Sequence, residues 1–382
     1  MHVMHVIDSM HGGGAETSLL EVVPGLASRG VRTSIVTLLT DDGGLESRLD
    51  AVGIEPRRLS YRDPVRLLRE LRNVINSELP DLLHTTLMFA NLAGRVAARP
   101  VGIPVVTTLA NLDYGPEHRA NSCYGAWGVR AAQSADMVTA PLTRRFHAIS
   151  VVVASVMGRR LRIPSDRIEV VYRGRDPARL GIVTIERRLR TRAALGIDAG
   201  APVVLSVGRL DRQKGVETTV EAFRRLVARV PDAVLLVAGR PGNASAVVEA
   251  SAGGAVAVRL LGHRTDVPDL MCAADVLSFP SRWEGLGGTL VEAMALRLSI
   301  VASDIEPVAE AIGDVGWPLV RPDDASALAE GLASVLERGA ASDSRKDAGE
   351  KRFRKHFTAE AACDGMVNFY KNALRATRIH QC

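Results

Sequence analysis

The sequence contains few residues of the kinds that mark secreted, zinc-binding or membrane-spanning proteins. Four of its 382 residues are cysteine (Cys123, Cys272, Cys363 and Cys382), and no C-x-x-C spacing occurs. This pattern indicates reduced thiols in a cytoplasmic protein and offers no zinc site. No apolar run approaches the roughly 20 residues of a membrane span, and the N-terminus "MHVMHVIDSM" does not have the regions of a signal peptide. Peripheral contact with the inner face of a membrane is still compatible with the sequence.

Aromatic residues are also scarce, at 4%, although 47% of the residues are hydrophobic and 24% are charged. This balance is typical of a folded protein with an aliphatic core. At roughly 100–200 residues per domain, a chain of 382 residues predicts two compact domains.

The net charge of +5 is carried mainly by arginine, which clusters in "GRRLR" (158–162) and "ERRLRTR" (186–192). These clusters fit either solvated helix faces or a surface that contacts anionic lipid or a phosphorylated substrate. Neither cluster has interleaved aromatic residues, so the sequence predicts no nucleic-acid partner.

Short β-branched runs alternate with segments of helical period along most of the chain. The expected strands are residues 2–8, 32–38, 103–109, 136–141 and 167–172 and, after Ala201, residues 202–210, 233–240, 255–262, 274–281, 298–303 and 315–321. This alternation predicts parallel sheets covered by helices, because a parallel strand pair needs a crossover connection. The expected fold class is therefore α/β, with two Rossmann-like, doubly wound domains facing a cleft.

The strand pattern is interrupted by a segment rich in Arg, Gly and Pro, which predicts a boundary between the domains. The expected divisions are an N-terminal domain over 1–175, a linker over 176–200, a C-terminal domain over 201–355 and a closing helix over 356–382. Thr358 is the expected N-cap of that helix. We expect it to pack back on the N-terminal domain.

Open α/β sheets bind ligands at the carboxyl ends of their strands, so we searched the segments that follow the expected strands. Three glycines, 12–14, follow the first strand and open a helix, where backbone N–H groups can face an anion. A dinucleotide fingerprint would need a glycine at Thr17 and an acidic residue after "VTLLT", and both are absent. A nicotinamide oxidoreductase is therefore disfavoured.

Two cations, Arg209 and Lys214, follow the first strand of the C-terminal domain in "LSVGRLDRQKG". Surface charges would be the ordinary interpretation, but their place after a buried strand favours a ligand role. Each charge-assisted hydrogen bond contributes roughly 1.5–3 kcal/mol, so the two together suit a diphosphate.

Two carboxylates, Glu284 and Glu292, bracket a glycine run in "FPSRWEGLGGTLVEAMA". The run lies where an apolar strand gives way to a helix whose first turn leaves N–H groups unpaired. Carboxylates accept hydrogen bonds from hydroxyls, and these two can hold different parts of one ligand. For Glu284 a purely structural carboxylate at the helix start is the alternative.

These motifs together resemble one family. The glycine run 12–14, "GRLDRQKG" and "PSRWEGLGGTLVEAMA" are similar to the motifs of the retaining, nucleotide-sugar-dependent glycosyltransferases of family four, which have the GT-B fold. The resemblance runs along essentially the whole chain, and the two C-terminal motifs are the specific ones.

The resemblance implies a donor site. Its implied roles are diphosphate binding for Arg209 and Lys214, ribose binding for Glu292, and holding of the donor sugar and phosphates for Glu284. The remaining implied donor residues are Gly13, Gly14, Arg264, Gly285, Leu286, Gly287 and Gly288.

The resemblance also implies a retaining mechanism in which no side chain acts as nucleophile. Catalysis would rest on neutralising the departing diphosphate, with Arg209, Lys214 and Glu284 as the catalytic residues. The absence of a D-x-D motif is consistent with metal-independent activity, and the implied co-substrate is a nucleotide-diphosphate sugar, without any further cofactor.

The sequence departs from the family where a histidine is common near the donor sugar, because Ala110 and Asn111 stand there. Asn111, His118 and His84 are the candidate acceptor-side residues. His118 is open between a donor-sugar contact and a surface position, and His84 between an acceptor contact and a structural hydrogen bond. The acceptor class stays open among lipid-linked sugars, polysaccharides and small molecules.

Two other classes remain as alternatives. One is another enzyme of the same fold, such as a nucleotide-sugar epimerase. The other is a non-catalytic nucleotide-sugar-binding protein.

Overall fold

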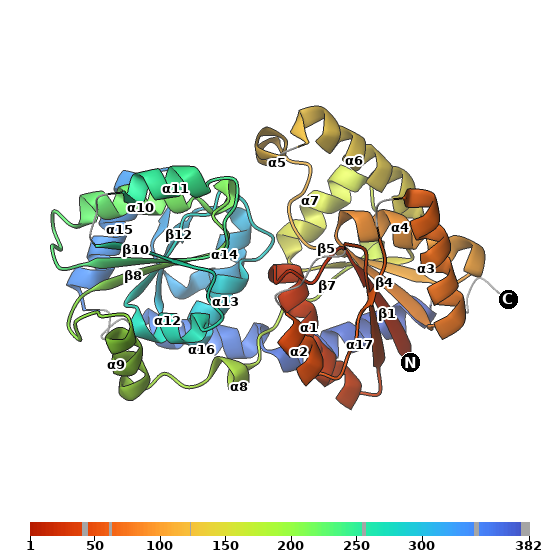
Figure 1. Cartoon of the computed structure of the whole chain (residues 1–382), viewed down its shortest axis with the longest axis horizontal. Coiled ribbons are helices and arrows are strands. Elements are labelled where there is room, and N and C mark those ends of the chain that lie inside the picture. Colours follow the sequence, from red (N-terminus) through yellow and green to blue (C-terminus); the bar gives the residue numbers. More distant parts are fainter. Residues whose placement is uncertain (40–44, 61–62, 123, 254–256, 340–343, 376–382) are drawn as a thin grey trace. The chain divides into compact units, whose positions relative to one another are not determined.

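The computed structural model describes residues 1–39, 45–60, 63–122, 124–253, 257–339 and 344–375 (Figure 1). It divides into two compact units, each described by itself below. Unit 1 comprises Met1–Arg175 and Phe357–Cys382, and unit 2 comprises Asp176–His356. Cys272 and Cys363 are buried free thiols, whereas Cys123 and Cys382 lie outside the described residues.

Unit 1 is built on a seven-stranded parallel sheet with the order β3-β2-β1-β4-β5-β6-β7. The strands are β1 (His2–Ile7), β2 (Arg32–Thr37), β3 (Arg57–Arg58), β4 (Leu82–Thr86), β5 (Val105–Leu109), β6 (Arg145–Ala148) and β7 (Ile168–Val170). Its helices are α1 (Gly14–Ser28), α2 (Glu46–Ala51), α3 (Pro64–Glu78), α4 (Met88–Ala98), α5 (Pro116–Asn121), α6 (Gly125–Thr139), α7 (Val151–Leu161) and α17 (Ala359–Arg375).

Both faces of the unit 1 sheet are buried, since successive side chains of a strand point to opposite faces. Met4 and Leu83 pack with α3 and α4 on one face. Val3 and Leu82, one position earlier on the same strands, pack with α1 and α17 on the other. Thr358 caps α17 as predicted, because its Oγ1 accepts a hydrogen bond from the Ala361 N–H.

The strand expected over residues 136–141 is wrong. This segment ends α6 and enters a short 3₁₀ turn, and the strand follows at Arg145–Ala148. Asp136 explains the difference, because its buried carboxylate pairs with Arg95 of α4 and accepts a hydrogen bond from the Tyr114 hydroxyl. These contacts outweigh the β-propensity of the segment.

Unit 2 contains a six-stranded parallel sheet with the order β10-β9-β8-β11-β12-β13. The strands are β8 (Val203–Val207), β9 (Val234–Ala238), β10 (Val258–Gly262), β11 (Val276–Phe279), β12 (Ser299–Ser303) and β13 (Leu319–Val320). The helices are α8 (Pro177–Leu180), α9 (Ile185–Ala194), α10 (Val216–Leu226), α11 (Ser245–Ala252), α12 (Val267–Ala273), α13 (Gly288–Ala295), α14 (Glu306–Ile312), α15 (Ala325–Glu337) and α16 (Arg345–His356). Residues 255 and 256 of the expected third strand lie outside the described residues.

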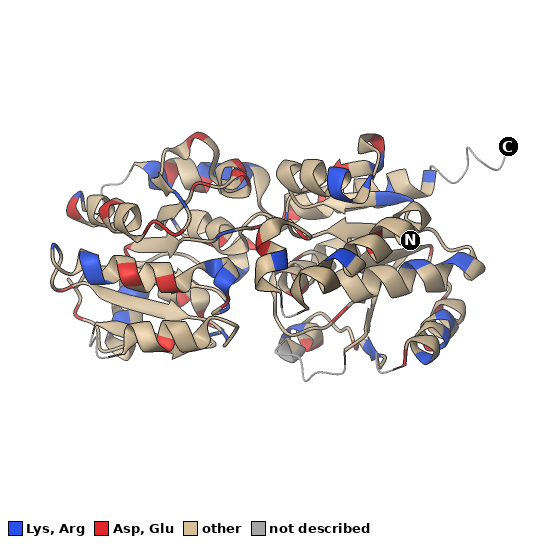
Figure 2. Ribbon diagram, turned by 90° about the horizontal axis from the view of Figure 1, so that it is seen from above, with Lys and Arg blue, Asp and Glu red and all other residues tan. Residues whose placement is uncertain are grey.

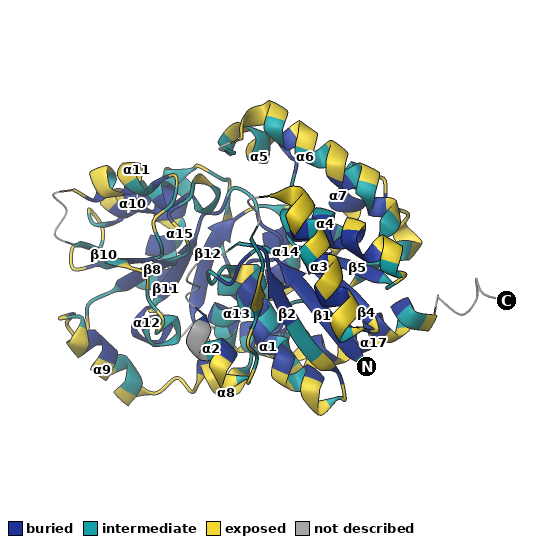
Figure 3. Ribbon diagram, turned by 45° about the vertical axis from the view of Figure 1, so that its right-hand side comes forward, coloured by how far each residue is buried: buried dark blue, intermediate teal, exposed yellow. Residues whose placement is uncertain are grey.

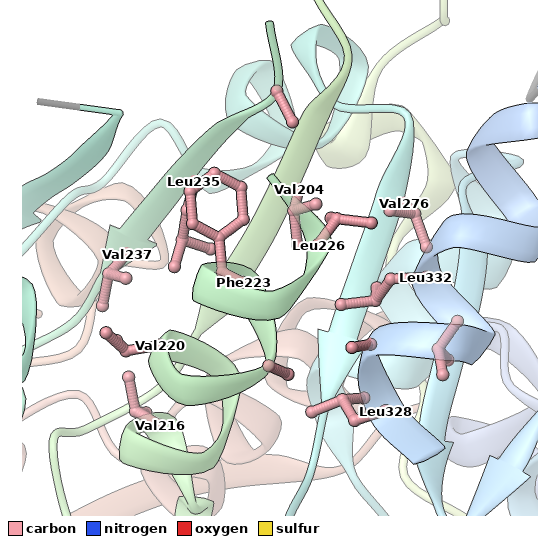
Figure 4. Packing of buried hydrophobic residues seen from close by; sticks show 14 of the residues in the cluster. Val204, Val216, Val220, Phe223, Leu226, Leu235, Val237, Val276, Leu328 and Leu332 are labelled. Atoms are coloured by element: carbon pink, nitrogen blue, oxygen red, sulfur yellow. The ribbon is translucent and has the colours of Figure 1, made fainter. Parts of the chain in front are cut away.

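One core of unit 2 lies between the sheet and helices α10 and α15 (Figure 4). Phe223 and Leu226 of α10 and Leu332 of α15 pack against Val204 and Val276 of the strands. Because β8 and β11 are paired as parallel strands, their carboxyl ends lie side by side.

The linker expected over residues 176–200 folds as part of unit 2. Its helix α9 packs on α12, and the side chain of Arg192 is 1% exposed. The Arg192 guanidinium donates to Asp275 and to four backbone carbonyls. Arg187 and Arg188 form ion pairs with Asp269 and Asp275. The "ERRLRTR" cluster therefore largely holds α9 against the rest of unit 2 and is not simply a solvated face. Charges of both signs lie on other helices of unit 2 (Figure 2).

The chain leaves unit 1 after Arg175 and returns to it at Phe357, and these two segments are paired. The Arg175 N–H donates to the Phe357 carbonyl at 2.8 Å, and the Ala359 N–H donates to the Arg175 carbonyl at 2.9 Å. Gly174 makes this approach possible, because a Cβ there would lie 2.2 Å from the Thr358 carbonyl oxygen.

Candidate functional site

In unit 2 the strand order reverses between β8 and β11, which is where an open α/β sheet binds ligands. Two loops meet at this point. The first follows β8 and contains Arg209 and Lys214, and the second follows β11 and contains Glu284 and the glycines that open α13.

Backbone contacts hold the two loops together. The Arg282 N–H donates to the Gln213 carbonyl at 2.8 Å, and the Gln213 side-chain amide donates to the Trp283 carbonyl at 2.9 Å. Gly215 has a φ of 61°, and a Cβ there would lie 2.4 Å from the Pro280 carbonyl oxygen. Only glycine fits this position without a backbone shift.

Lys214 and Glu284 form an ion pair across the two loops. Lys214 Nζ lies 2.5 Å from Glu284 Oε1, and the Ser281 hydroxyl donates to the same oxygen at 2.9 Å. Lys214 also lies over the Phe279 ring, 5.7 Å from its centroid. The side chains are 22% and 7% exposed, so the pair is shielded but Lys214 remains accessible to a ligand. The family resemblance implies diphosphate binding for Lys214 and holding of the donor sugar and phosphates for Glu284, and the structure brings these two side chains into direct contact.

Arg209 is far more exposed than Lys214. Its side chain is 60% exposed, and its Nη2 lies 3.1 Å from Asp211 Oδ2. An exposed pair of this kind contributes little to stability, so its guanidinium can turn to an anion at small cost.

The helix start after β11 supplies backbone donors at the same place. Gly287 is the N-cap of α13 with a φ of 87°, and Gly288 is the first residue of the helix. The first N–H groups of a helix have no partner within it. Gly285 and Leu286 are buried, and Leu286 is 2% exposed, so its apolar side chain belongs to the core. Glu292 is half-buried within α13, one turn further on.

Arg264 lies away from this group, after β10, two strands from β8. Its guanidinium forms a bidentate pair with Asp266, with donor–acceptor distances of 2.8 and 2.6 Å. The structure therefore gives Arg264 an acidic partner of its own.

In unit 1, His84 lies in the middle of β4 and not at a strand mouth. Its side chain is buried, with one ring nitrogen hydrogen-bonded to the Tyr370 hydroxyl at 2.8 Å and the other to the Thr108 hydroxyl at 2.7 Å. Thr108 is hydrogen-bonded in turn to His147 at 3.0 Å, and the ring centroid of His5 lies 4.8 Å from that of His84. Of the two alternatives, the structural hydrogen bond is the one that the structure shows.

Asn111 and His118 both stabilise the loop that follows β5. The Asn111 side-chain oxygen accepts a hydrogen bond from the Leu112 N–H at 2.9 Å. His118 Nδ1 accepts one from the Tyr114 N–H at 3.0 Å, where Tyr114 has a φ of 66°. Neither residue is brought into contact with His84, which lies beneath α17.

The glycine run opens α1 at the carboxyl end of β1, with Gly13 as the N-cap. A Cβ at Gly13 would lie 2.6 Å from Glu16 Oε2, so glycine leaves room for this buried carboxylate. The nearby Asp8 accepts hydrogen bonds from the Ala90 and Phe89 N–H groups at the start of α4. Burial raises the pKa of the Asp8 carboxyl to about 7, although the two N–H groups lower it.

Comparison with known proteins decides the family. Residues 187–354 match the model described as glycosyl transferases group 1, and residues 12–179 match the model described as glycosyltransferase family 4. The chain belongs to glycosyltransferase family four.

Individual relatives of this glycosyltransferase agree with that assignment. It is 30% identical to an alpha-maltose-1-phosphate synthase of Mycolicibacterium smegmatis, over 65% of this chain and 66% of that protein. It is 28% identical to a 2-deoxystreptamine N-acetyl-D-glucosaminyltransferase of Streptomyces fradiae, over 94% of this chain and 87% of that one. The first match thus spans about two thirds of its relative, and the second most of it.

The fold of the glycosyltransferase is GT-B. It superimposes on the crystal structure of Anabaena HepE in complex with UDP-glucose with a TM-score of 0.83 and 20% identity, covering 97% of this chain and 100% of the other. At this identity the likeness concerns the fold alone.

Several residues around the glycosyltransferase site were not found from the sequence. Ser281 and Asp211, which contact Glu284 and Arg209, are common loop residues, and their spacing carries no distinctive signal. Asp8 could have been noticed, because an acidic residue directly after a buried strand and before a glycine run lies at a binding edge.

Proposed function

We propose that this glycosyltransferase moves a sugar from a nucleotide-diphosphate donor to a hydroxyl acceptor, with retention of the anomeric configuration and without a metal ion. The observation that carries the proposal is the Lys214–Glu284 pair at the β8–β11 switch point, beside the first turn of α13. The cation and the N–H groups at the start of α13 suit the phosphates of a nucleotide sugar, and the carboxylate suits its hydroxyls.

The diphosphate is the expected partner of Lys214. In the ligand-free chain Glu284 neutralises Lys214, and a diphosphate carries more negative charge than one carboxylate and can also reach Arg209. Binding then shares Lys214 with the phosphates and leaves Glu284 to accept hydrogen bonds from sugar hydroxyls. Glu292 accepts hydrogen bonds from the ribose hydroxyls.

Rate enhancement follows from the same contacts. When the bond between the anomeric carbon and the diphosphate breaks, negative charge grows on the leaving oxygen. Lys214, Arg209 and the N–H groups at the start of α13 lie where that charge can be stabilised. The acceptor oxygen attacks from the face that the diphosphate leaves and passes its proton to the departing diphosphate oxygen, so no side-chain nucleophile is required.

Similar proteins support this choice of partners. The HepE structures contain UDP and UDP-glucose, and the Streptomyces fradiae relative is named as a 2-deoxystreptamine N-acetyl-D-glucosaminyltransferase. For this chain the acceptor is a lipid-linked sugar, a polysaccharide or a small molecule, taken up by unit 1 in the cytoplasm or at the inner face of the membrane. Among the described helices, none combines the length and the apolar character needed to cross a bilayer.

Calorimetric titration with UDP, GDP and ADP tests the donor site. We expect one nucleotide to bind and Arg209→Gln to weaken it by about 1.5–3 kcal/mol, roughly a factor of 10 to 150. Arg212→Gln is the matched control, because Arg212 is an exposed arginine of the same loop. Lys214→Gln is paired with Glu284→Gln in one double variant, so that no buried carboxylate is left without its cation.

Turnover completes the test. Transfer or slow hydrolysis of the matching nucleotide sugar should continue in excess EDTA, and NMR of the product should show the anomeric configuration of the donor. Nucleotide binding that Arg209→Gln and the double variant leave unchanged would refute the donor site. Inversion in the product would refute the retaining mechanism alone.

A further inference from the structure

The outer face of α6 in unit 1 carries several exposed apolar residues, beside exposed Arg130 and Ser134. Tyr124, Trp127 and Val138 are 65%, 80% and 74% exposed. Ala131 and Ala135 are exposed between them. These five residues, here named the α6 stripe, follow one another at intervals of three and four positions, which places them on one side of the helix. The exposed residues along α6 are visible in Figure 3.

A surface helix normally directs polar residues to solvent, and α3 of the same unit does so. Both helices have 15 residues. The exposed positions of α3 include Arg66, Arg69 and Arg72, whereas the centre of the exposed face of α6 has no charged residue. The α6 stripe is therefore a local departure from the surface pattern of this unit.

The aromatic end of the stripe is built for exposure. A Cβ at Gly128 would lie 2.7 Å from the Tyr124 Cβ, so the glycine leaves room for the tyrosine on the helix surface. The other two tryptophans of the chain are sheltered, with Trp283 half-buried and Trp317 4% exposed. Exposed Trp and Tyr side chains on one helix are typical of residues that insert at the membrane–water interface.

Arginines are frequent in the segment that contains the stripe. The segment from His118 to Arg162 contains seven arginines and a single acidic residue, Asp136, which is buried against Arg95. The Arg130 guanidinium lies over the Trp127 ring, 5.3 Å from its centroid. Arg159 and Arg162, at the end of α7, are exposed as well. An apolar aromatic stripe with basic flanks complements an anionic phospholipid surface.

We infer that the α6 stripe docks unit 1 on a membrane that contains anionic phospholipid. A second copy of the chain fits less well as the partner. A two-fold symmetric contact through the stripe would bring the basic residues of both copies close together. One helix face is also narrow beside the roughly 800 Å² per partner of a standard interface.

The stripe lies next to the part of unit 1 that faces substrate. Helix α6 begins soon after the loop that follows β5, so Tyr124 and Trp127 are at the carboxyl edge of the sheet, where open α/β sheets bind ligands. Docking there would present an acceptor held in the bilayer to this edge. The inference goes beyond the proposed transfer reaction and does not depend on the donor site in unit 2.

Vesicle co-sedimentation of the full chain tests the inference. We expect binding to vesicles of phosphatidylglycerol and phosphatidylcholine and little binding to phosphatidylcholine alone. The Tyr124→Ser, Trp127→Ser double variant should bind at least about tenfold more weakly, and Arg130→Gln about fivefold more weakly. Ile185→Ser, which changes a 78% exposed isoleucine of unit 2, is the matched control and should bind as the parent does.

Tryptophan fluorescence provides a second measurement. Bound vesicles should shift the emission of the parent to shorter wavelength, and Trp127→Phe should bind nearly as well but lose the shift. Equal binding by the double variant and the parent, or no preference for anionic vesicles, would overturn the inference. If the parent forms dimers in sedimentation velocity and the double variant does not, the inference would be overturned in favour of self-association. Nucleotide titration of the same variants distinguishes a failure of this inference from a failure of the donor site, because these variants should bind the nucleotide as tightly as the parent does.

Discussion

The buried histidines of unit 1 should make this unit sensitive to acid. His5, His84 and His147 lie together under α17, and their rings are 3%, 3% and 7% exposed. Burial lowers the pKa of His5 to about 3 and that of His147 to about 4, and it lowers the pKa of His84 well below its ordinary value, 6.5. The folded unit therefore holds all three rings neutral at a pH where the unfolded chain protonates them.

The size of the effect follows from these values. Each pH unit between the unfolded and folded pKa of a group corresponds to about 1.4 kcal/mol. At pH 5, about 1.5 units below 6.5, His5 and His147 should each lower the free energy of unfolding by about 2 kcal/mol, and the two together by about 4. His84 should act in the same direction. This stability is fully present above pH 6.5 and is lost as the pH falls towards the folded pKa values.

Asp8 acts in the opposite direction. Its folded pKa is raised to about 7, so the folded unit gains a proton before the unfolded chain does. Between pH 8 and pH 5 this should return about 3 kcal/mol, which offsets part of the loss that the three histidines cause. We therefore expect Asp8→Asn to make the acid sensitivity greater.

Hydrogen exchange followed by mass spectrometry, corrected for intrinsic rates, measures the opening free energy of the peptides that cover β1 and β4. The histidine contribution is isolated by His5→Phe, which keeps a buried ring and should reduce the loss between pH 8 and pH 5 by about 2 kcal/mol. His263→Gln, an exposed histidine of unit 2, should leave it unchanged. An unchanged loss in His5→Phe, or NMR titration of the buried rings near pH 6.5, would refute the reasoning.

Three further variants test unit 2. Gly215→Ala forces a Cβ towards the Pro280 carbonyl oxygen at a positive φ, so it should lower thermal stability by about 1–3 kcal/mol and weaken nucleotide binding, whereas a Gly200→Ala control, which has open space, should not. Lys214→Met leaves Glu284 buried without its cation and should destabilise unit 2 by about 3 kcal/mol in urea unfolding, and adding Glu284→Gln should recover most of this loss. Arg192→Met should lower the free energy of unfolding by about 3–5 kcal/mol, because Asp275 and four carbonyls lose their donor. The exposed Arg190→Met control should change it negligibly, and equal stabilities of the two variants would show that the buried guanidinium is not needed.

The sheets were largely predictable because both are parallel and buried, so their strands appear as short β-branched runs between helical segments. The errors arose where distant contacts outweigh local preference. Residues 136–141 look like a strand, but Asp136 is held in α6 by Arg95. His84 looks like the end of a strand, but it is a core residue because Tyr370, far along the chain, satisfies one of its nitrogens.

The candidate donor site was predictable in its components but not in its arrangement. Lys214 follows β8 and Glu284 follows β11. Both residues therefore lie at the edge of the parallel sheet where its strands end. Their ion pair depends on the close approach of Gly215 to Pro280, which no local pattern announces. In unit 1, the α6 stripe was overlooked because Trp127 lies in neither arginine cluster, and its exposure and its contact with Arg130 depend on how α6 packs.

The paired segments at Arg175 and Phe357 make unit 2 an insertion into unit 1. Because the Arg175 N–H and carbonyl both bond to the returning segment, the two ends of unit 2 start from adjacent points. A module whose ends lie together can be exchanged as one continuous block, or removed and replaced by a short connection, without cutting the host sheet. The stretch from Asp176 to His356 is thus a natural cassette, which the corresponding unit of a relative could replace while the sheet of unit 1 stays intact.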